Sequence, residues 1–190
     1  MAARVGLTAQ RLAEAAAELA DEEGFAAVSA SALARRFGVS VASLYAHVRN
    51  LEELRVRVTA LALTEMADRA AAAIAGRSGK EALAALADAY RSYAQEHPGR
   101  YAAAGVRIDP ESVAAAPAVR HAELARALLR GYPGLPAAEH THAVRMIGAT
   151  INGFIGLEAA GAFAHGGDTS VSWSRMLDAL DLALAHWPAR

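Results

Sequence analysis

The apolar residues of this chain recur at helical spacing within segments that glycine, proline and polar residues separate. In the first segment, Leu12, Ala16 and Leu19 share one face of a predicted helix. Thr8 is placed to cap the start of this helix, and Gly24 is placed to end it. Alanine and leucine dominate the composition and β-branched runs are scarce, so the pattern predicts an all-α protein.

Three more helices are predicted in the first third of the chain. A short one covers about residues 31–37, with Ser29 or Ser31 as its cap and Gly38 as its end. Ser40 caps the next, which extends to about His47, and a long helix follows to about residue 75. Further helices are predicted over residues 78–97, 117–130, 136–163 and 171–186. We therefore predict a head over residues 1–50, a connecting helix over 51–76 and a helical body over 77–190.

The head has the pattern of a helix-turn-helix. Its tight turn needs a residue that tolerates positive φ, which is Gly38, and the preceding helix needs a small residue at the crossing, which is Ala34. An ordinary helical hairpin that never meets DNA fits the same spacing. The neighbouring Tyr45, His47 and Arg49 favour DNA, because hydroxyl, imidazole and guanidinium groups can all contact phosphates.

The N-terminal residues resemble the tetracycline-repressor (TetR) family of bacterial transcription regulators. The resemblance covers about residues 8–58, "TAQRLAEAAAELADEEGFAAVSASALARRFGVSVASLYAHVRNLEELRVRV". The body resembles the WHG-domain branch of that family in "RSGKEALAALADAYRSYAQEHPGRY" and "NGFIGLEAAGAF". Asn152 stands where that branch usually has histidine. The resemblance implies a homodimer that binds double-stranded, palindromic operator DNA as a repressor and is released by a small-molecule effector.

By its motif position, the recognition helix is Val41 to His47. The expected contacts come from this helix, from the residues around its end and from the starts of the preceding helices: Thr8, Ser29, Ser31, Arg35, Arg36, Ser40, Val41, Ala42, Ser43, Tyr45, His47, Arg49 and Asn50. Many relatives have lysine at the place of Val41. Here an apolar side chain supplies no charge but can meet a thymine methyl group.

Charge changes this picture only locally. The whole chain has a formal net charge of −1, and residues 1–57 contain seven arginines and seven acids. The attraction to phosphates must therefore come from individual arginines, and we expect Arg35 or Arg36, Arg49 and Arg4 to supply most of it. We expect Arg55 and Arg57 to be ordinary solvated surface residues.

The body contains two sets of candidate residues, and each has a plainer explanation. A stripe of Tyr90, Tyr93 and His97 predicts either a ligand pocket or simple core packing, and the further pocket candidates are Tyr101, Met146, Thr150, Asn152 and Phe154. Small residues on one helix and an apolar stripe on the last predict either a dimer interface or packing within one subunit: Gly148, Gly156, Ala160, Trp173, Leu177, Leu180 and Leu184. Glu158, a lone acid, is expected to pair with an arginine.

The sequence has no motif that indicates an enzyme, a metal site or a membrane protein. The chain has no cysteine, no paired carboxylates, no phosphate-binding loop and no nucleophile constellation, so we expect no enzyme, metal site or cofactor. No segment has the length and composition of a membrane span, and we expect a cytoplasmic protein. The alternative function is a dimeric helical protein that binds a small molecule but no operator.

Overall fold

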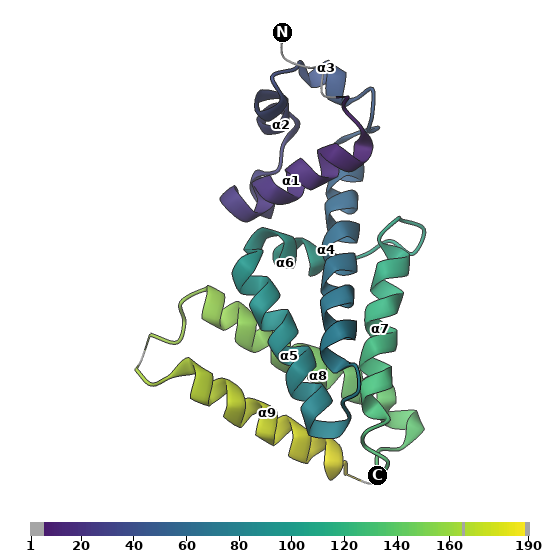
Figure 1. Ribbon diagram of the computed structural model, residues 1–190, viewed down its shortest axis with the longest axis vertical. Coiled ribbons are helices and arrows are strands. Elements are labelled where there is room, and N and C mark those ends of the chain that lie inside the picture. Colours follow the sequence, from purple (N-terminus) through teal and green to yellow (C-terminus); the bar gives the residue numbers. More distant parts are fainter. Residues whose placement is uncertain (1–5, 165, 189–190) are drawn as a thin grey trace. The chain divides into compact units, whose positions relative to one another are not determined.

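The structure is a computed structural model, which describes residues 6–164 and 166–188. Helices form all the regular secondary structure in these two ranges, as predicted (Figure 1). Contacts divide the chain into two compact units: Met1–Met66 with Glu96–Val119, and Ala67–Gln95 with Arg120–Arg190. We call them unit 1 and unit 2. The division falls within three helices, so the unit that contains the head also contains residues from the middle of the chain.

The head in unit 1 begins with α1 (Ala9–Glu23), a 3₁₀ turn (Phe25–Ala27), α2 (Ala30–Phe37) and α3 (Val41–Leu44), and continues into α4 (Leu51–Ile74). Hydroxyl groups cap the first three α-helices, because Thr8, Ser29 and Ser40 each accept a backbone N–H three residues ahead. Ser29, not Ser31, is thus the cap of α2. The core beneath is made of fully buried leucine, valine and alanine side chains, including Leu12, Leu33, Leu44 and Val58.

The third helix is shorter than predicted. Only Val41–Leu44 is α-helical, and residues 45–47 form a turn instead of extending the helix to His47. The N–H groups of His47 and Val48 both bond to the Leu44 carbonyl, at 2.9 and 3.3 Å. This tightening turns Val48 into the core, where it is 4% exposed.

A short helix, α6 (Pro98–Ala104), packs directly on the end of α1 within unit 1. Gly99 permits this, because a Cβ at its position would lie 1.9 Å from the Ala20 carbonyl oxygen. The Asp21 carboxylate accepts from the Arg100 N–H at 2.9 Å and lies 3.0 Å from the His97 Nδ1. These contacts join α6 firmly to α1.

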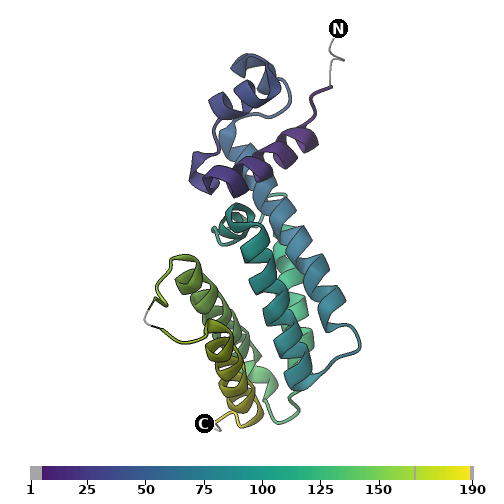
Figure 2. The ribbon, with the colours of Figure 1, turned by 60° about the vertical axis from the view of Figure 1, so that its left-hand side comes forward.

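Unit 2 contains the rest of the body: most of α5 (Gly79–Glu96), most of α7 (Ala115–Leu129), a 3₁₀ turn (Ala137–Glu139), α8 (His140–Ala159) and α9 (Thr169–Ala185). In Figure 2, α8 and α9 lie side by side as a helical hairpin. α8 ends before the predicted residue 163, because Gly161 adopts a positive φ of 68° and its N–H bonds back to Glu158. None of the helices in the described ranges is both long and apolar enough to cross a membrane.

An ion pair at the end of α8 confirms the prediction for Glu158. The Arg91 Nε donates to Glu158 at 2.9 Å, and the Arg91 guanidinium lies 5.0 Å from the centre of the Trp173 ring. The hydrogen bond from Arg91 lowers the pKa of the Glu158 carboxyl. This pair ties α5 to α8 within unit 2.

Candidate nucleic-acid interface

The turn between α2 and α3 has the geometry that the sequence predicts for a helix-turn-helix. Gly38 adopts the left-handed conformation, with φ 64° and ψ 34°, which favours glycine. Its N–H and that of Val39 bond back to Arg35 and Ala34 at 3.2 and 3.0 Å. Ala34 is buried, so its small side chain allows the close crossing of the two helices. The predicted roles of Gly38 and Ala34 are confirmed.

The solvent-facing side of α3 and its following turn forms the surface that we call the α3 face. It consists of Ser40, Val41, Ala42, Tyr45 and His47, all of which are exposed. The apolar side chain of Val41 is 36% exposed, and the aromatic side chain of Tyr45 is 45% exposed. Leu44, between them, is buried in the head core, which fixes the orientation of this face.

Hydroxyl groups at α3 bond to one another. The Ser40 Oγ accepts from the Ser43 N–H at 3.2 Å and lies 2.8 Å from the Ser43 Oγ. Ser43 is half-buried, so its hydroxyl supports the start of α3 more than it adds to the α3 face. Ser31 lies one residue inside α2 and is exposed.

The arginines near this face differ in how they are held. Arg35 is exposed at the end of α2, whereas Arg36 donates to Glu22 at 2.7 Å and to Glu18 at 2.8 Å on α1. These bonds raise the pKa of Arg36 and direct its guanidinium toward α1. Arg36 is therefore committed to the head's own packing, contrary to its predicted availability. Arg4 lies outside the described residues.

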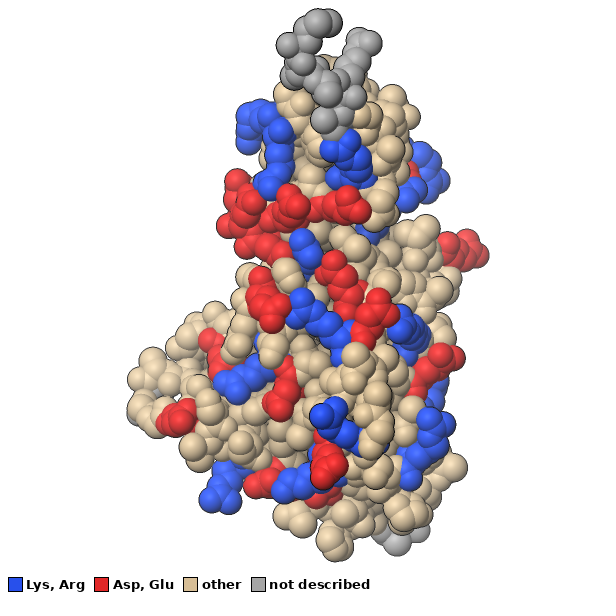
Figure 3. Space-filling view, in the orientation of Figure 1, with Lys and Arg blue, Asp and Glu red and all other residues tan. Residues whose placement is uncertain are grey.

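The charged residues are segregated on the side of the head that Figure 3 shows. Basic side chains lie in separate groups across the upper end, one of them over α2, and acidic side chains form a band along α1. The acids that pair with Arg36, Glu18 and Glu22, belong to this band on α1.

Glu53 organises the start of α4, a role that the sequence analysis missed. The Asn50 Oδ1 accepts from the Glu53 N–H at 2.8 Å, and the Glu53 carboxylate accepts from the Arg49 N–H at 2.7 Å. This reciprocal arrangement resembles a capping box, for which the spacing of Asn50 and Glu53 is a recognisable signal. The Arg49 N–H, and next the Arg57 guanidinium, lower the pKa of the Glu53 carboxyl to about 2.

The side chain of Arg49 stays accessible despite its contact with Glu53, because it is 87% exposed. Arg57 pairs with Glu53 at 2.7 Å, and Arg55 donates to the backbone carbonyls of Ala26 and Val28. Arg55 and Arg57 are thus bound into the head, and the expectation that they are simply solvated was wrong.

The predicted pocket residues are divided between the two units. His97 and Tyr101 belong to unit 1, where burial raises the pKa of Tyr101 to about 12. The other six, in unit 2, are Tyr90, Tyr93, Met146, Thr150, Asn152 and Phe154. The Tyr90 hydroxyl lies 2.7 Å from the His121 Nδ1, the Tyr93 ring is fully buried, and the Phe154 ring packs against Trp173 with ring centres 5.0 Å apart.

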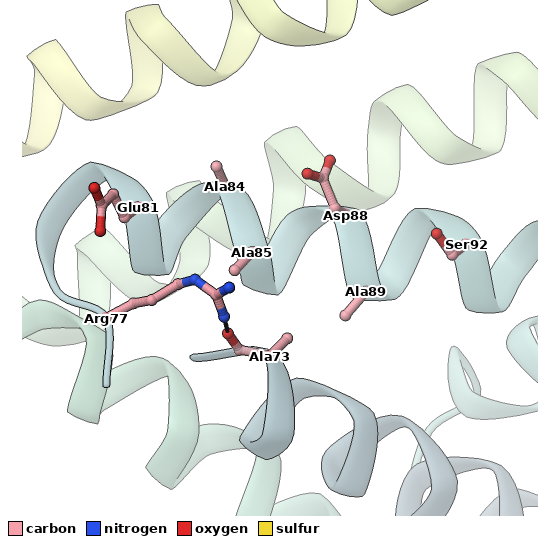
Figure 4. A pocket seen from close by; sticks show the side chains of 8 residues that line it. All are labelled: Ala73, Arg77, Glu81, Ala84, Ala85, Asp88, Ala89 and Ser92. Atoms are coloured by element: carbon pink, nitrogen blue, oxygen red, sulfur yellow. Dashed lines mark hydrogen bonds between the residues drawn. The ribbon is translucent and has the colours of Figure 1, made fainter. Parts of the chain in front are cut away.

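A separate hollow of about 570 Å³ runs along α5 in unit 2 (Figure 4). Short side chains, among them Ala84, Ala85 and Ala89, leave this space open beside the end of α4. The Arg77 guanidinium donates to the Ala73 carbonyl, and the Asp88 carboxylate accepts from the Trp173 indole at 2.7 Å. Its lining contains none of the predicted pocket residues.

The predicted dimer residues divide into two groups. Gly156 on α8 and Ala160, the residue after the end of α8, are exposed, and Gly148 is half-buried. The predicted face of α9 is turned inward, because its four residues are at most 5% exposed in the isolated chain: Trp173, Leu177, Leu180 and Leu184. This corrects the expectation that α9 offers these residues to a second subunit. They pack inside unit 2, as the plainer explanation proposed.

Comparison with known proteins decides the family. Residues 12–58 match the family of bacterial regulatory proteins described as the tetR family, and residues 83–180 match the tetracyclin repressor-like C-terminal domain. The chain belongs to the TetR family. It is 34% identical to the HTH-type transcriptional regulator YobS of Bacillus subtilis over 177 aligned residues. The alignment covers 92% of this chain and 91% of YobS. This TetR-family chain is thus a DNA-binding transcriptional regulator.

Solved structures agree with the fold of this TetR-family chain. A protein from Rhodococcus sp. RHA1 matches with a TM-score of 0.79 and 20% identity, over 97% of this chain and all of the other. A TetR variant from Acinetobacter baumannii, in complex with minocycline, matches with a TM-score of 0.66 and 23% identity, over 96% and 97% of the two chains. Membership of the WHG branch stays a prediction.

Proposed function

We propose that this TetR-family regulator is a homodimeric repressor that binds a palindromic operator through two α3 faces and is released by a small-molecule effector. The observation that carries the proposal is the α3 face itself. Val41, Ala42 and Tyr45 are held outward by a helix whose opposite side is locked into the head core by Leu44. Exposed apolar and aromatic groups on a rigid helix suit contact with base edges in a major groove.

The α3 face reads DNA mainly by shape and by methyl contacts. Val41 and Ala42 have no hydrogen-bonding side chain, so they meet thymine methyl groups, while Tyr45 and His47 donate to phosphates or base edges. Arg35 and Arg49 supply the phosphate attraction, together with backbone N–H groups at the capped helix starts beside Thr8, Ser29 and Asn50. Arg36 is left out of this set because Glu18 and Glu22 hold it.

The proposed dimer interface is the outer face of the α8–α9 hairpin. Leu157 on α8 and Val171 and Leu182 on α9 are large apolar side chains that are 50%, 55% and 58% exposed, and exposed apolar side chains that form one patch mark interaction sites. Gly156 on α8 and Ala160 directly after it are also exposed, and their small size permits the close approach of a partner helix. A symmetric pairing of two such hairpins makes a four-helix bundle.

We also propose that the protein acts in the cytoplasm, where its operator is accessible. The alternative, a dimeric small-molecule-binding protein without operator affinity, makes the opposite prediction in one assay. Full-length protein is incubated with a random duplex library, and bound duplexes are recovered and sequenced. Enrichment of one sequence motif supports the regulator, and the absence of enrichment supports the alternative.

Substitutions in the α3 face then test its role. Tyr45→Ala should weaken binding to the recovered duplex by about fivefold to a hundredfold, as expected for the loss of one good contact. Tyr45→Phe keeps the ring and removes only the hydroxyl, so it separates stacking from hydrogen bonding. Val119→Ala, at an exposed apolar position on α7, serves as the control and should bind normally. Unchanged affinity of Tyr45→Ala and His47→Ala would reject the assigned face.

A further inference from the structure

Unit 1 contains a cavity of about 250 Å³ that none of the proposed contacts uses. It lies between the first turns of α4 and the segment that links α6 to α7, which runs beside α4 in Figure 1. Phe25, Val56, Val106 and Ile108 give it an apolar lining. Because ligand pockets typically measure about 300–1,000 Å³, a cavity of this size suits a small ligand.

One wall of the cavity carries a positive charge that nearby carboxylates do not neutralise. The Arg55 Nη2 donates to the carbonyl oxygens of Val28 and Ala26, at 3.0 and 3.4 Å. Carbonyl groups orient a guanidinium but carry no counter-charge. The Arg55 Nε is buried and has no hydrogen-bond partner within the described ranges. A half-buried guanidinium without a carboxylate partner favours the binding of an anion, because an anion would compensate its charge.

A second arginine lines the cavity from the opposite segment. Arg107 is exposed and has no ion-pair or hydrogen-bond partner among residues 6–164 and 166–188. It follows Val106, an apolar residue that is 41% exposed at the cavity. The cavity thus combines the Arg107 guanidinium, which has no partner in the described ranges, with the exposed apolar side chain of Val106.

The two acids that line the cavity are already stabilised by the backbone. The Asp109 carboxylate accepts from the Glu111 N–H at 2.9 Å, within the turn that leads into α7. Glu52 lies in the first turn of α4, where the helix dipole favours a negative charge. The lining thus contains two positive and two negative side chains, and its buried polar atom without a hydrogen-bond partner in the described ranges is the Arg55 Nε.

We propose that this cavity binds a small organic carboxylate, with its carboxylate group on Arg55 and Arg107 and its apolar body on Phe25, Val56 and Ile108. Such a ligand bridges α4 and the segment before α7, a few residues from the Asn50–Glu53 cap that follows the α3 face. Binding itself is independent of DNA. The further statement that this acid is the effector rests on the proposed function.

Isothermal titration calorimetry of the full-length protein with hydrocinnamate, without DNA, tests the binding. The uncharged amide of the same acid has nearly the same shape and should bind at least about tenfold more weakly, since it lacks the charge-assisted bonds. Arg107→Gln should weaken hydrocinnamate binding by about tenfold and leave amide binding unchanged. Arg126→Gln removes an exposed arginine of α7 in unit 2, and this control should bind hydrocinnamate normally.

A cavity-filling variant locates the site. Val56→Phe should abolish hydrocinnamate binding while the thermal unfolding of the variant stays cooperative, because Val56 is only half-buried. Equal affinities for acid and amide, unchanged binding in Arg107→Gln or Val56→Phe, or no binding at millimolar hydrocinnamate would each overturn the proposal.

Release of the protein from DNA tests the effector role separately. Hydrocinnamate should release the native protein, but not Val56→Phe, from a duplex recovered in the selection. Binding without release would overturn the effector role alone. Failure of the selection would count against operator binding and leave the calorimetric result intact.

Discussion

Gly99 at the start of α6 offers the sharpest test of how unit 1 is packed. The substitution Gly99→Ala adds one methyl group, whose carbon would lie 1.9 Å from the Ala20 carbonyl oxygen and 2.6 Å from the Asp21 nitrogen. Both neighbours are backbone atoms of α1, and Ala20 is fully buried. A rotation of a side chain cannot relieve this overlap. The helices themselves must separate.

The size of the effect follows from that separation. To restore ordinary contact, α6 must move away from α1 by about 1.5 Å, since dispersion contacts turn repulsive at shorter range. The bond from the Arg100 N–H to Asp21, now 2.9 Å, would then exceed hydrogen-bonding distance. Overpacking of this kind costs about 1–3 kcal/mol, and each lost hydrogen bond about 1 kcal/mol. We expect Gly99→Ala to lower the free energy of unfolding by about 2–4 kcal/mol.

Urea denaturation followed by circular dichroism measures this difference. Gly105→Ala is the matched control, because a Cβ there would meet nothing nearer than the Ala102 oxygen at 3.5 Å. Its free energy of unfolding should stay within about 0.5 kcal/mol of the native value. If both variants unfold at the same urea concentration, the close approach of α6 to α1 is not present in solution.

Three further substitutions test other parts of the structure. Thr59→Val removes the hydroxyl that donates to the Ala103 carbonyl at 3.1 Å within unit 1, and should destabilise by about 1–3 kcal/mol, measured by thermal unfolding against native protein. The Glu53 carboxyl has a folded pKa of about 2, below its ordinary value of 4.5, so it stabilises the fold above pH 4.5 and loses this effect as the pH falls toward 2. Glu53→Gln should therefore be less stable than native protein at neutral pH, and an acid titration should show the difference shrinking toward pH 2; a constant difference would refute the assignment. Leu182→Glu, on the outer face of α9, should shift sedimenting protein from dimer to monomer while its circular dichroism spectrum is retained, whereas an unchanged dimer would reject the α8–α9 interface.

Local signals in the sequence were sufficient for the head. Gly38, Thr8 and Ser40 act on neighbours within a few residues, so their spacing alone predicts the turn and the caps. The length of α3 was harder to predict. Its end depends on the burial of Val48 in the head core, which includes residues well before it in the sequence, such as Leu12 and Leu33. Local propensity does not register this burial.

Long-range pairing explains most of what was missed. Periodicity shows that Trp173 and Leu177 share an apolar face, but it does not say whether their own subunit or a partner covers that face. Arg36 is held by residues up to 18 positions away, and His97 by Asp21 at a separation of 76 positions. The predicted stripe of Tyr90, Tyr93 and His97 is divided, because α5 ends at Glu96 and His97 belongs to unit 1.

In the proposed complex, two α3 faces of a dimer read one symmetric operator. The number of protein copies on a duplex recovered by selection, measured by native mass spectrometry of the full-length protein, tests this directly. The recovered duplex should contain an inverted repeat and bind two copies, with an affinity that falls as salt rises. A recovered duplex without symmetry that binds a single copy, or a library from which no sequence is enriched, would contradict it.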